Sequence, residues 1–120
     1  MTAKAPLASP TRLTTALTHL AETIDARALD GDGASSWTAK LLARGPDAAA
    51  AKVAEEGGEL AEAVRRESDE RVASEAADVL YHVLVALRSR GVALDAVAAA
   101  LEARQGTSGI AEKAARPAQE

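Results

Sequence analysis

Residues 52 to 87 read KVAEEGGELAEAVRRESDERVASEAADVLYHVLVAL and contain two helical patterns joined by a turn. In each half the apolar residues return to one side of a helix, which is typical of an amphipathic segment. These apolar stripes are Val53, Leu60 and Val64 in the first half and Val72, Ala76, Val79 and Val83 in the second. The polar segment ESDE, Glu67 to Glu70, offers a tight turn between them. The stretch therefore predicts an antiparallel helical hairpin.

Three glutamates in the first half of this hairpin create a problem for the helix. Glu55, Glu56 and Glu59 crowd onto little more than one turn, with Gly57 and Gly58 between them. Like charges three or four residues apart repel, and each mid-helix glycine costs about 1 kcal/mol relative to alanine. Something outside this helix must compensate.

Acidic residues form a second stripe on each half of the hairpin. At about 100° per residue, each acidic stripe lies about 80–100° from the apolar stripe of its own helix, in the same rotational sense. Antiparallel helices that face each other through their apolar stripes then place both acidic stripes on one side. Glu59 and Asp78 also lie at one level, each about nine residues, or about 14 Å, from the turn. The four carboxylates expected to converge are Glu56, Glu59, Glu75 and Asp78.

Converging carboxylates predict a site for a hard divalent cation such as Mg²⁺, which takes oxygen ligands and would remove the repulsion. Asp78 is the decisive member, because apolar residues surround it in AADVLYHVLVAL and a buried, unpaired carboxylate is costly. His82 follows one turn later as a ligand, a proton carrier or a hydrogen-bond partner, although such a residue is more often a satisfied core histidine.

Other candidate groups have two interpretations each. The cations Lys40, Arg44 and Lys52 either bind phosphates or are simply solvated. Trp37 either stacks on a base or, more commonly for a large aromatic in a chain without Phe, packs in the core. Even the glutamates could form an ordinary solvated helix face.

The rest of the chain predicts an all-α fold of about five helices. The expected helices are Pro10 to Leu29 with Ser9 as cap, Trp37 to Arg44, Asp47 to Glu67, a helix from the ESDE turn to Arg90, and Leu94 to Gln105. One more turn could follow in the tail. A single hairpin cannot cover the apolar surface of its helices, so a four-helix-bundle core completed by dimerisation is expected. The expected domain limits are a tail at 1–8, one domain at 9–116 and a tail at 117–120.

Composition narrows the functions open to the chain. With 120 residues and a net charge of -4, it forms one domain and has no basic stripe for nucleic acid. Zero cysteines exclude disulfides, thiolate zinc sites and a cysteine nucleophile. No segment is apolar enough to predict a signal peptide or a membrane span, so a cytoplasmic location is expected.

Two long segments resemble the phosphoribosyl-ATP pyrophosphatase family, the enzymes of the second step of histidine biosynthesis. They are SWTAKLLARGPDAAAAKVAEEGGEL and EAADVLYHVLVALRSRGVALDAVAAALEARQGTSGIAEKA, and the similarity covers about Leu13 to Arg116. The wider group of all-α nucleotide pyrophosphohydrolases shares ExxE followed by ExxD, which here fall on the same four carboxylates. The chain departs from the family with Trp37 in place of a usual tyrosine and with Gly57-Gly58 in place of bulkier residues.

The resemblance implies Mg²⁺-dependent hydrolysis of phosphoribosyl-ATP to phosphoribosyl-AMP and pyrophosphate within a helical dimer. Glu55 or Glu56 is then the best candidate to orient or deprotonate the attacking water. The expected substrate-binding residues are Trp37, Thr38, Lys40, Arg44, Lys52 and His82. The resemblance also extends to the motif residues Ser36 and Leu41, and to Gly106, Ser108, Gly109, Glu112 and Lys113.

Two alternative functions stay open from the sequence. One is a general pyrophosphohydrolase that removes non-standard nucleoside triphosphates, which uses the same four carboxylates. The other is an acidic helical interaction module without catalysis, for which only weak, salt-screened binding of Mg²⁺ is expected.

Overall fold

The computed structural model describes residues 4, 6–7, 11–29, 36–105, 113–114 and 116–117. Within these residues the chain is helical and contains no strand, which confirms the predicted all-α fold. The helices are α1 (Arg12–Leu29), α2 (Trp37–Ala43), α3 (Pro46–Arg66), α4 (Asp69–Arg90) and α5 (Leu94–Ala103). Where the predicted ends are described, they agree to within two residues.

The chain forms two compact units, Met1–Arg90 and Gly91–Glu120. The first contains α1 to α4, and the second contains α5. The domain limits expected from the sequence, 9 and 116, stay a prediction. The predicted cap Ser9, the helix start at Pro10 and most of the tail motif lie outside the described residues. Lys113 is described and is exposed.

Local sequence explains how α2 and α3 begin. Ser36 caps α2, because its hydroxyl accepts a hydrogen bond of 3.0 Å from the Ala39 amide. Gly45 then turns the chain with φ 87° and ψ -179°, a backbone region that is essentially restricted to glycine. Pro46 follows at the first position of α3, where its fixed φ suits a helix and no amide partner is needed.

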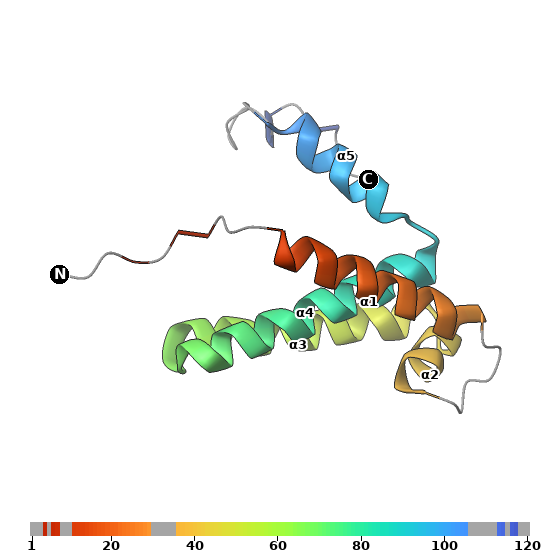
Figure 1. The fold of residues 1–120 in the computed structure, drawn as a ribbon, viewed down its shortest axis with the longest axis horizontal. Helices are drawn as coiled ribbons and strands as arrows, with labels where there is room; N and C mark the ends of the chain where they lie inside the picture. The colour runs from red at the N-terminus through yellow and green to blue at the C-terminus, as the bar shows by residue number, and fades with distance from the viewer. Residues whose placement is uncertain are drawn as a thin grey trace. The chain divides into compact units, whose positions relative to one another are not determined.

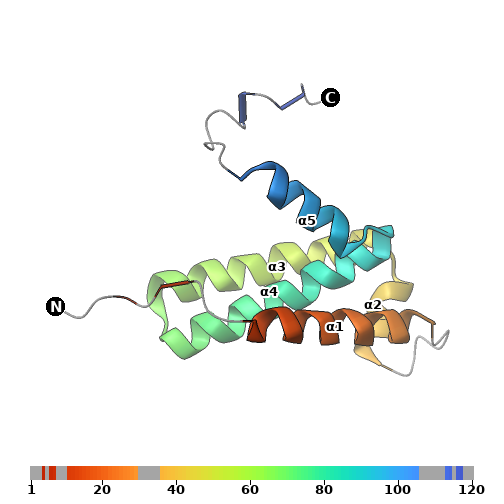
Figure 2. The same cartoon turned by 45° about the horizontal axis from the view of Figure 1, so that its top comes forward.

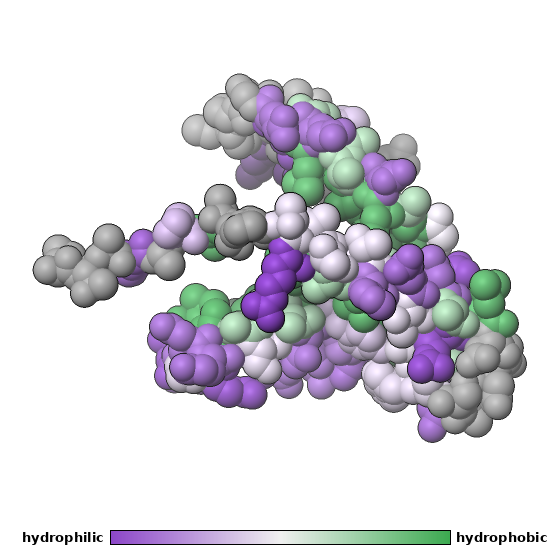
Figure 3. Space-filling view, in the orientation of Figure 1, coloured by the Kyte–Doolittle hydropathy of each residue, from purple (hydrophilic) through white to green (hydrophobic). Residues whose placement is uncertain are grey.

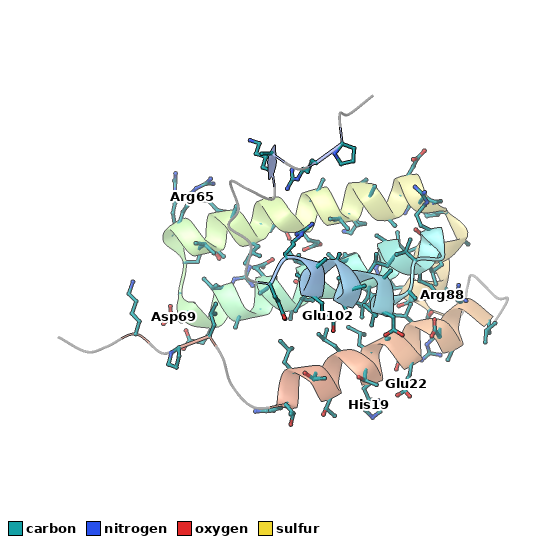
Figure 4. The ribbon with its side chains drawn as sticks, turned by 90° about the horizontal axis from the view of Figure 1, so that it is seen from above. His19, Glu22, Arg65, Asp69, Arg88 and Glu102 are labelled. Atoms are coloured by element: carbon teal, nitrogen blue, oxygen red, sulfur yellow. The ribbon has the colours of Figure 1, made fainter. Side chains whose placement is uncertain are left out.

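The predicted hairpin of α3 and α4 is present, and its helices lie side by side in antiparallel directions (Figures 1 and 2). Its turn is Glu67 and Ser68, and the Ser68 hydroxyl accepts a hydrogen bond of 3.2 Å from the Arg71 amide in the first turn of α4. Arg65 and Asp69 mark this turn end in Figure 4. At the other end, Gly91 stops α4 with φ 69°.

The apolar core lies at the end of the hairpin away from the turn. Ile24 of α1, Leu41 of α2 and the α4 residues Leu84 and Val85 are buried together there. Full burial of each such side chain contributes about 1.5–3 kcal/mol. Arg88 joins α4 to α1 through an ion pair of 2.9 Å between its Nε and Asp25 Oδ1.

The turn end of the hairpin has less cover. In Figures 1, 2 and 4, α1 runs along the part of the hairpin that is distant from the turn. Apolar surface is visible at the turn end in Figure 3, and Val64 is 64% exposed. The expectation that Val64 packs inside the hairpin is therefore wrong. Val53 and Leu60, the other members of its stripe, are only partly buried.

In the second unit, α5 contains no buried residue, and Leu101 is 59% exposed. Its helix ends at Ala103, while Arg104 and Gln105 form a turn where the sequence predicted helix. Among the described residues, no helix combines the length and the apolar character that a membrane crossing requires.

Candidate metal and substrate site

Carboxylates from α3 and α4 meet on one side of the hairpin, as the sequence predicted. One carboxylate oxygen from each of Glu56, Glu75 and Asp78 lies within 4.8 Å of the other two. Glu56 comes from the middle of α3, and the other two come from the facing part of α4. Three charged groups at this separation repel strongly unless cations or protons intervene.

Glu59 is bound to this cluster through Glu56. The two side chains share a hydrogen bond, which raises the pKa of Glu59, and the Glu56 charge raises it further. The same hydrogen bond lowers the pKa of Glu56. One interaction thus shifts the two pKa values in opposite directions. Glu59 is therefore a neighbour of the three carboxylates that lie within 4.8 Å of one another.

The depth of these carboxylates differs from the prediction. Glu56 and Glu75 are only 7% and 5% exposed, whereas Asp78 is exposed. The expectation that Asp78 is a buried carboxylate is therefore wrong. The reason is the rotation of the helices: α3 buries Ala49, Glu56 and Ala63, which repeat every two turns, so the acidic stripe points inward and the valine stripe lies to its side.

Lys52 lies against the acidic cluster from within α3. Its Nζ is 3.3 Å from Glu55 Oε2 and 3.5 Å from Glu56 Oε1, and the hydrogen bond to Glu55 raises the pKa of Lys52. The same ammonium group lies 5.9 Å from the centre of the Trp37 ring. Two predicted substrate-binding residues are therefore neighbours at the edge of the cluster. Trp37 is 49% exposed, so its interpretation as a core residue is wrong.

Sequence reasoning missed Arg71, which contacts the cluster from α4. Its Nη2 donates a hydrogen bond of 2.5 Å to Glu75 Oε1, and its Nε donates one of 3.1 Å to Glu67 Oε1. The spacing of four residues on either side, which places such pairs together on a helix, could have revealed it.

His82 is buried beside the carboxylates and is only half satisfied. Its Nδ1 lies 2.8 Å from the main-chain oxygen of Asp78. A carbonyl only accepts hydrogen bonds, so Nδ1 bears a proton and is the donor. That Nε2 atom is buried with no hydrogen-bond partner. The interpretation of His82 as a satisfied core histidine therefore accounts for one ring nitrogen only.

A second residue that sequence reasoning missed, Tyr81, connects His82 to α2. Its ring meets the His82 ring edge to face, with centroids 4.8 Å apart. Its hydroxyl shares a short hydrogen bond with the hydroxyl of Thr38. Thr38 is thereby held near the site. Lys40 on α2 and Arg44 directly after this helix are exposed, and no hydrogen bond or ion pair joins their side chains to the cluster within the described chain.

The donor set fits a hard divalent cation. It consists of carboxylate oxygens from two rigid helices, the ligand type that Mg²⁺ prefers. Among the carboxylate oxygens of these residues, Glu75 Oε2 is buried and has no hydrogen-bond partner. A buried, charged oxygen without a partner is costly, and a bound cation would satisfy it.

Comparison with known proteins places this arrangement in a family. The family model described as phosphoribosyl-ATP pyrophosphohydrolase matches residues 17–105, which include all four carboxylates. The chain belongs to the phosphoribosyl-ATP pyrophosphohydrolase family.

Similar proteins of this family extend over most of the chain. A protein of Cereibacter sphaeroides is 61% identical over 104 residues, which are 85% of this chain and 98% of the relative. A protein of Ruegeria pomeroyi is 59% identical over 102 residues, which are 84% of this chain and 95% of the relative. A protein of Caulobacter vibrioides is 52% identical over 105 residues, which are 88% of this chain and 96% of the relative. Each is named phosphoribosyl-ATP pyrophosphatase.

Proposed function

We propose that this chain hydrolyses phosphoribosyl-ATP to phosphoribosyl-AMP and pyrophosphate, the second step of histidine biosynthesis. The observation that supports this most is the meeting of Glu56, Glu75 and Asp78 within 4.8 Å, in a chain of the phosphoribosyl-ATP pyrophosphohydrolase family. Water is consumed and the bond between the α- and β-phosphates breaks. From the biosynthetic family we also propose a cytoplasmic location.

The reaction is proposed to depend on Mg²⁺, because the substrate is a triphosphate and the site is strongly acidic. When bound, Mg²⁺ supplies Lewis acidity to phosphate oxygens and neutralises charge on the departing pyrophosphate. The residues that would hold it are Glu56, Glu59, Glu75 and Asp78.

Glu55 and Glu56 are the two candidates to orient or deprotonate the attacking water, and the geometry separates their roles. Glu56 is buried within the cluster and its lowered pKa makes it a weak base, which suits a metal ligand. Glu55 has a half-exposed side chain, and its one described partner is Lys52. We therefore assign the orientation or deprotonation of the attacking water to Glu55 and the binding of the metal to Glu56.

Substrate binding is assigned to the residues around the cluster. Lys52 can release its ion pair with Glu55 and bind a phosphate oxygen of the substrate in its place. Beside it, the exposed ring of Trp37 is available to stack on the base of the substrate. His82 Nε2 has no hydrogen-bond partner in the chain and is available to the substrate. The remaining proposed binding residues are Thr38, Lys40 and Arg44.

The decisive experiment measures pyrophosphate release from phosphoribosyl-ATP by pure protein, with Mg²⁺ and with EDTA. We expect release with Mg²⁺ and none with EDTA, and no release in either condition would refute the proposed activity.

A panel of deoxynucleoside triphosphates tests the alternative of a general pyrophosphohydrolase: phosphoribosyl-ATP should have the highest kcat/KM. A Mg²⁺ titration by calorimetry tests the interaction module, for which only weak, salt-screened binding is expected.

Two substitutions test the division between Glu55 and Glu56. Glu55→Gln should abolish turnover and leave Mg²⁺ affinity nearly unchanged, whereas Glu56→Gln should weaken both. Equal loss of Mg²⁺ binding in the two variants would contradict the assignment.

A further inference from the structure

Arg71 is held in a fixed position on α4 by residues on both sides of it. Its Nε is bonded to Glu67 and its Nη2 to Glu75, at 3.1 and 2.5 Å. Glu67 lies in the turn, four residues before Arg71, and Glu75 lies one turn after it on α4. The guanidinium is planar, so two bonds through different nitrogens fix its orientation as well as its position.

The hydrogen bond from Arg71 places the two carboxylate oxygens of Glu75 in different environments. Oε1 accepts the hydrogen bond from Nη2, whereas Oε2 is buried without a partner. The Glu75 side chain is only 6% exposed, so water does not compete freely for either oxygen. Because Oε1 is held by Arg71, Oε2 is left as the unpartnered oxygen of Glu75, a residue that meets Glu56 and Asp78 within 4.8 Å at a carboxylate oxygen.

We propose that Arg71 is a positioning residue for the divalent cation: it holds Glu75 through one oxygen so that the other is pre-oriented as a ligand. The inference rests on the proposed metal site and adds to it a residue outside the four carboxylates. Carboxylates that bind metals are themselves hydrogen-bonded, and loss of such a partner typically weakens metal binding about tenfold to a hundredfold.

The positive charge of Arg71 opposes cation binding, but it is the weaker effect. Glu67 already neutralises this charge at 3.1 Å. The Arg71 side chain is also 56% exposed, so its field at the cluster is screened by water and salt. The directional bond to nearly buried Glu75 is not screened in this way. Removal of Arg71 should therefore weaken the binding of Mg²⁺.

The test is a Mg²⁺ titration of the full chain by calorimetry without substrate, together with melting temperatures in EDTA and at a fixed, non-saturating Mg²⁺ concentration. Arg71→Gln removes the charge and both bonds. Arg71→Lys keeps the charge but loses the rigid two-pronged geometry. Arg66→Gln is the matched control. It removes an exposed ion pair on α3, in which Arg66 Nε lies 3.3 Å from Glu62 Oε1.

We expect the Kd for Mg²⁺ to rise about tenfold or more in Arg71→Gln, by a smaller factor in Arg71→Lys, and to stay unchanged in Arg66→Gln. The Mg²⁺-induced rise in melting temperature should shrink in the same order. A merely structural role would lower the melting temperature equally with and without Mg²⁺ and leave Kd unchanged, which overturns the proposal.

A lower Kd in Arg71→Gln also overturns it, because Arg71 would then compete with the cation for Glu75. If the wild-type chain itself does not bind Mg²⁺, the proposed metal site fails as well. Wild-type binding with an unchanged Kd in Arg71→Gln refutes the role of Arg71 alone.

Discussion

Individual residues explain why the metal-free site is under electrostatic stress. Glu56 and Glu75 are more than nine-tenths buried, and each has one cation from its own helix, Lys52 or Arg71. Asp78 lies within 4.8 Å of both glutamates at a carboxylate oxygen, and no cation pairs with its side chain within the described chain. The carboxylates therefore outnumber the cations that neutralise them.

Substitution of Asp78 by asparagine separates a metal ligand from a structural carboxylate. In EDTA, Asp78→Asn should melt no lower than wild type, and we expect its melting temperature to be about 1–4 °C higher. The reason is that the loss of one like charge removes about 0.2–0.5 kcal/mol of repulsion from the folded state. Mg²⁺ should raise the wild-type melting temperature, since a ligand bound only by the folded state stabilises it, but should hardly change the mutant's. Hydrolysis should nearly vanish.

The opposite pattern has a clear meaning. Were Asp78 part of a structural ion pair, its loss would destabilise the fold whether or not metal is present. A mutant that melts well below wild type in EDTA, yet keeps its response to Mg²⁺, would show that the metal lies elsewhere.

Glu59 should make the metal-free protein sensitive to pH. Its pKa is raised above the ordinary 4.5, chiefly by the hydrogen bond with Glu56 and then by the Glu56, Glu75 and Glu55 charges. A raised folded-state pKa contributes stability that is complete below about pH 4.5 and is lost as the pH rises through the folded-state value. In EDTA, Glu59→Gln should thus melt above wild type at pH 7–8, and the gap should close towards pH 4.5. Thermal melts of both proteins across this range measure the gap; a constant gap would contradict the raised pKa of Glu59.

At the scale of the helices, the hairpin could be predicted because local rules determine it. Spacing around 3.6 residues fixes which residues share a face, and a turn of two residues limits the levels at which the acidic stripes of the two helices meet. Ser36 and Ser68, which cap the following helices, also follow from local sequence. The meeting of Glu56, Glu75 and Asp78 was therefore accessible from the sequence alone.

The depth of each side chain was not accessible in the same way. Burial of Glu56 and Glu75 in place of Val64 and Asp78 depends on the rotation of α3 and α4, which is set by what packs against them. Local periodicity contains no information on that rotation. The role of Tyr81, which meets Thr38 across 43 positions of sequence, was hidden for the same reason.

The glycine pair of α3 gives a test at this scale. An added Cβ at Gly57 or Gly58 meets nothing within 4 Å in this chain, so Gly57→Ala and Gly58→Ala should each stabilise the helix by about 0.5–1 kcal/mol. Gly45→Ala is the control and should destabilise by about 1–3 kcal/mol, because φ at this position is 87°. Urea unfolding measures all three. A loss of stability at Gly57 or Gly58 would show that another molecule approaches the α3 backbone there.

At the scale of the whole molecule, the cover of the hairpin is uneven. The core of Ile24, Leu41, Leu84 and Val85 unites α1, α2 and the later half of α4. At the turn end, the valine stripe of α3 and α4 is partly buried or exposed. Apolar surface arranged along two helices in this way is typical of a face that packs against another helical pair.

We therefore expect a dimer in which two hairpins complete a four-helix bundle, with twice the 12.3 kDa mass of the chain in sedimentation equilibrium at micromolar concentration. Val64→Glu should shift the protein towards the monomer, because it places a charge on a side chain that is 64% exposed in one chain but is expected to be buried between two. His19→Glu adds the same charge on α1, where His19 projects away from α4 (Figure 4), and should leave the dimer intact. A folded wild-type monomer at this concentration would refute the expectation. An intact Val64→Glu dimer would place the interface elsewhere on the chain, because a charge buried without a partner at a small interface costs enough to shift the equilibrium measurably.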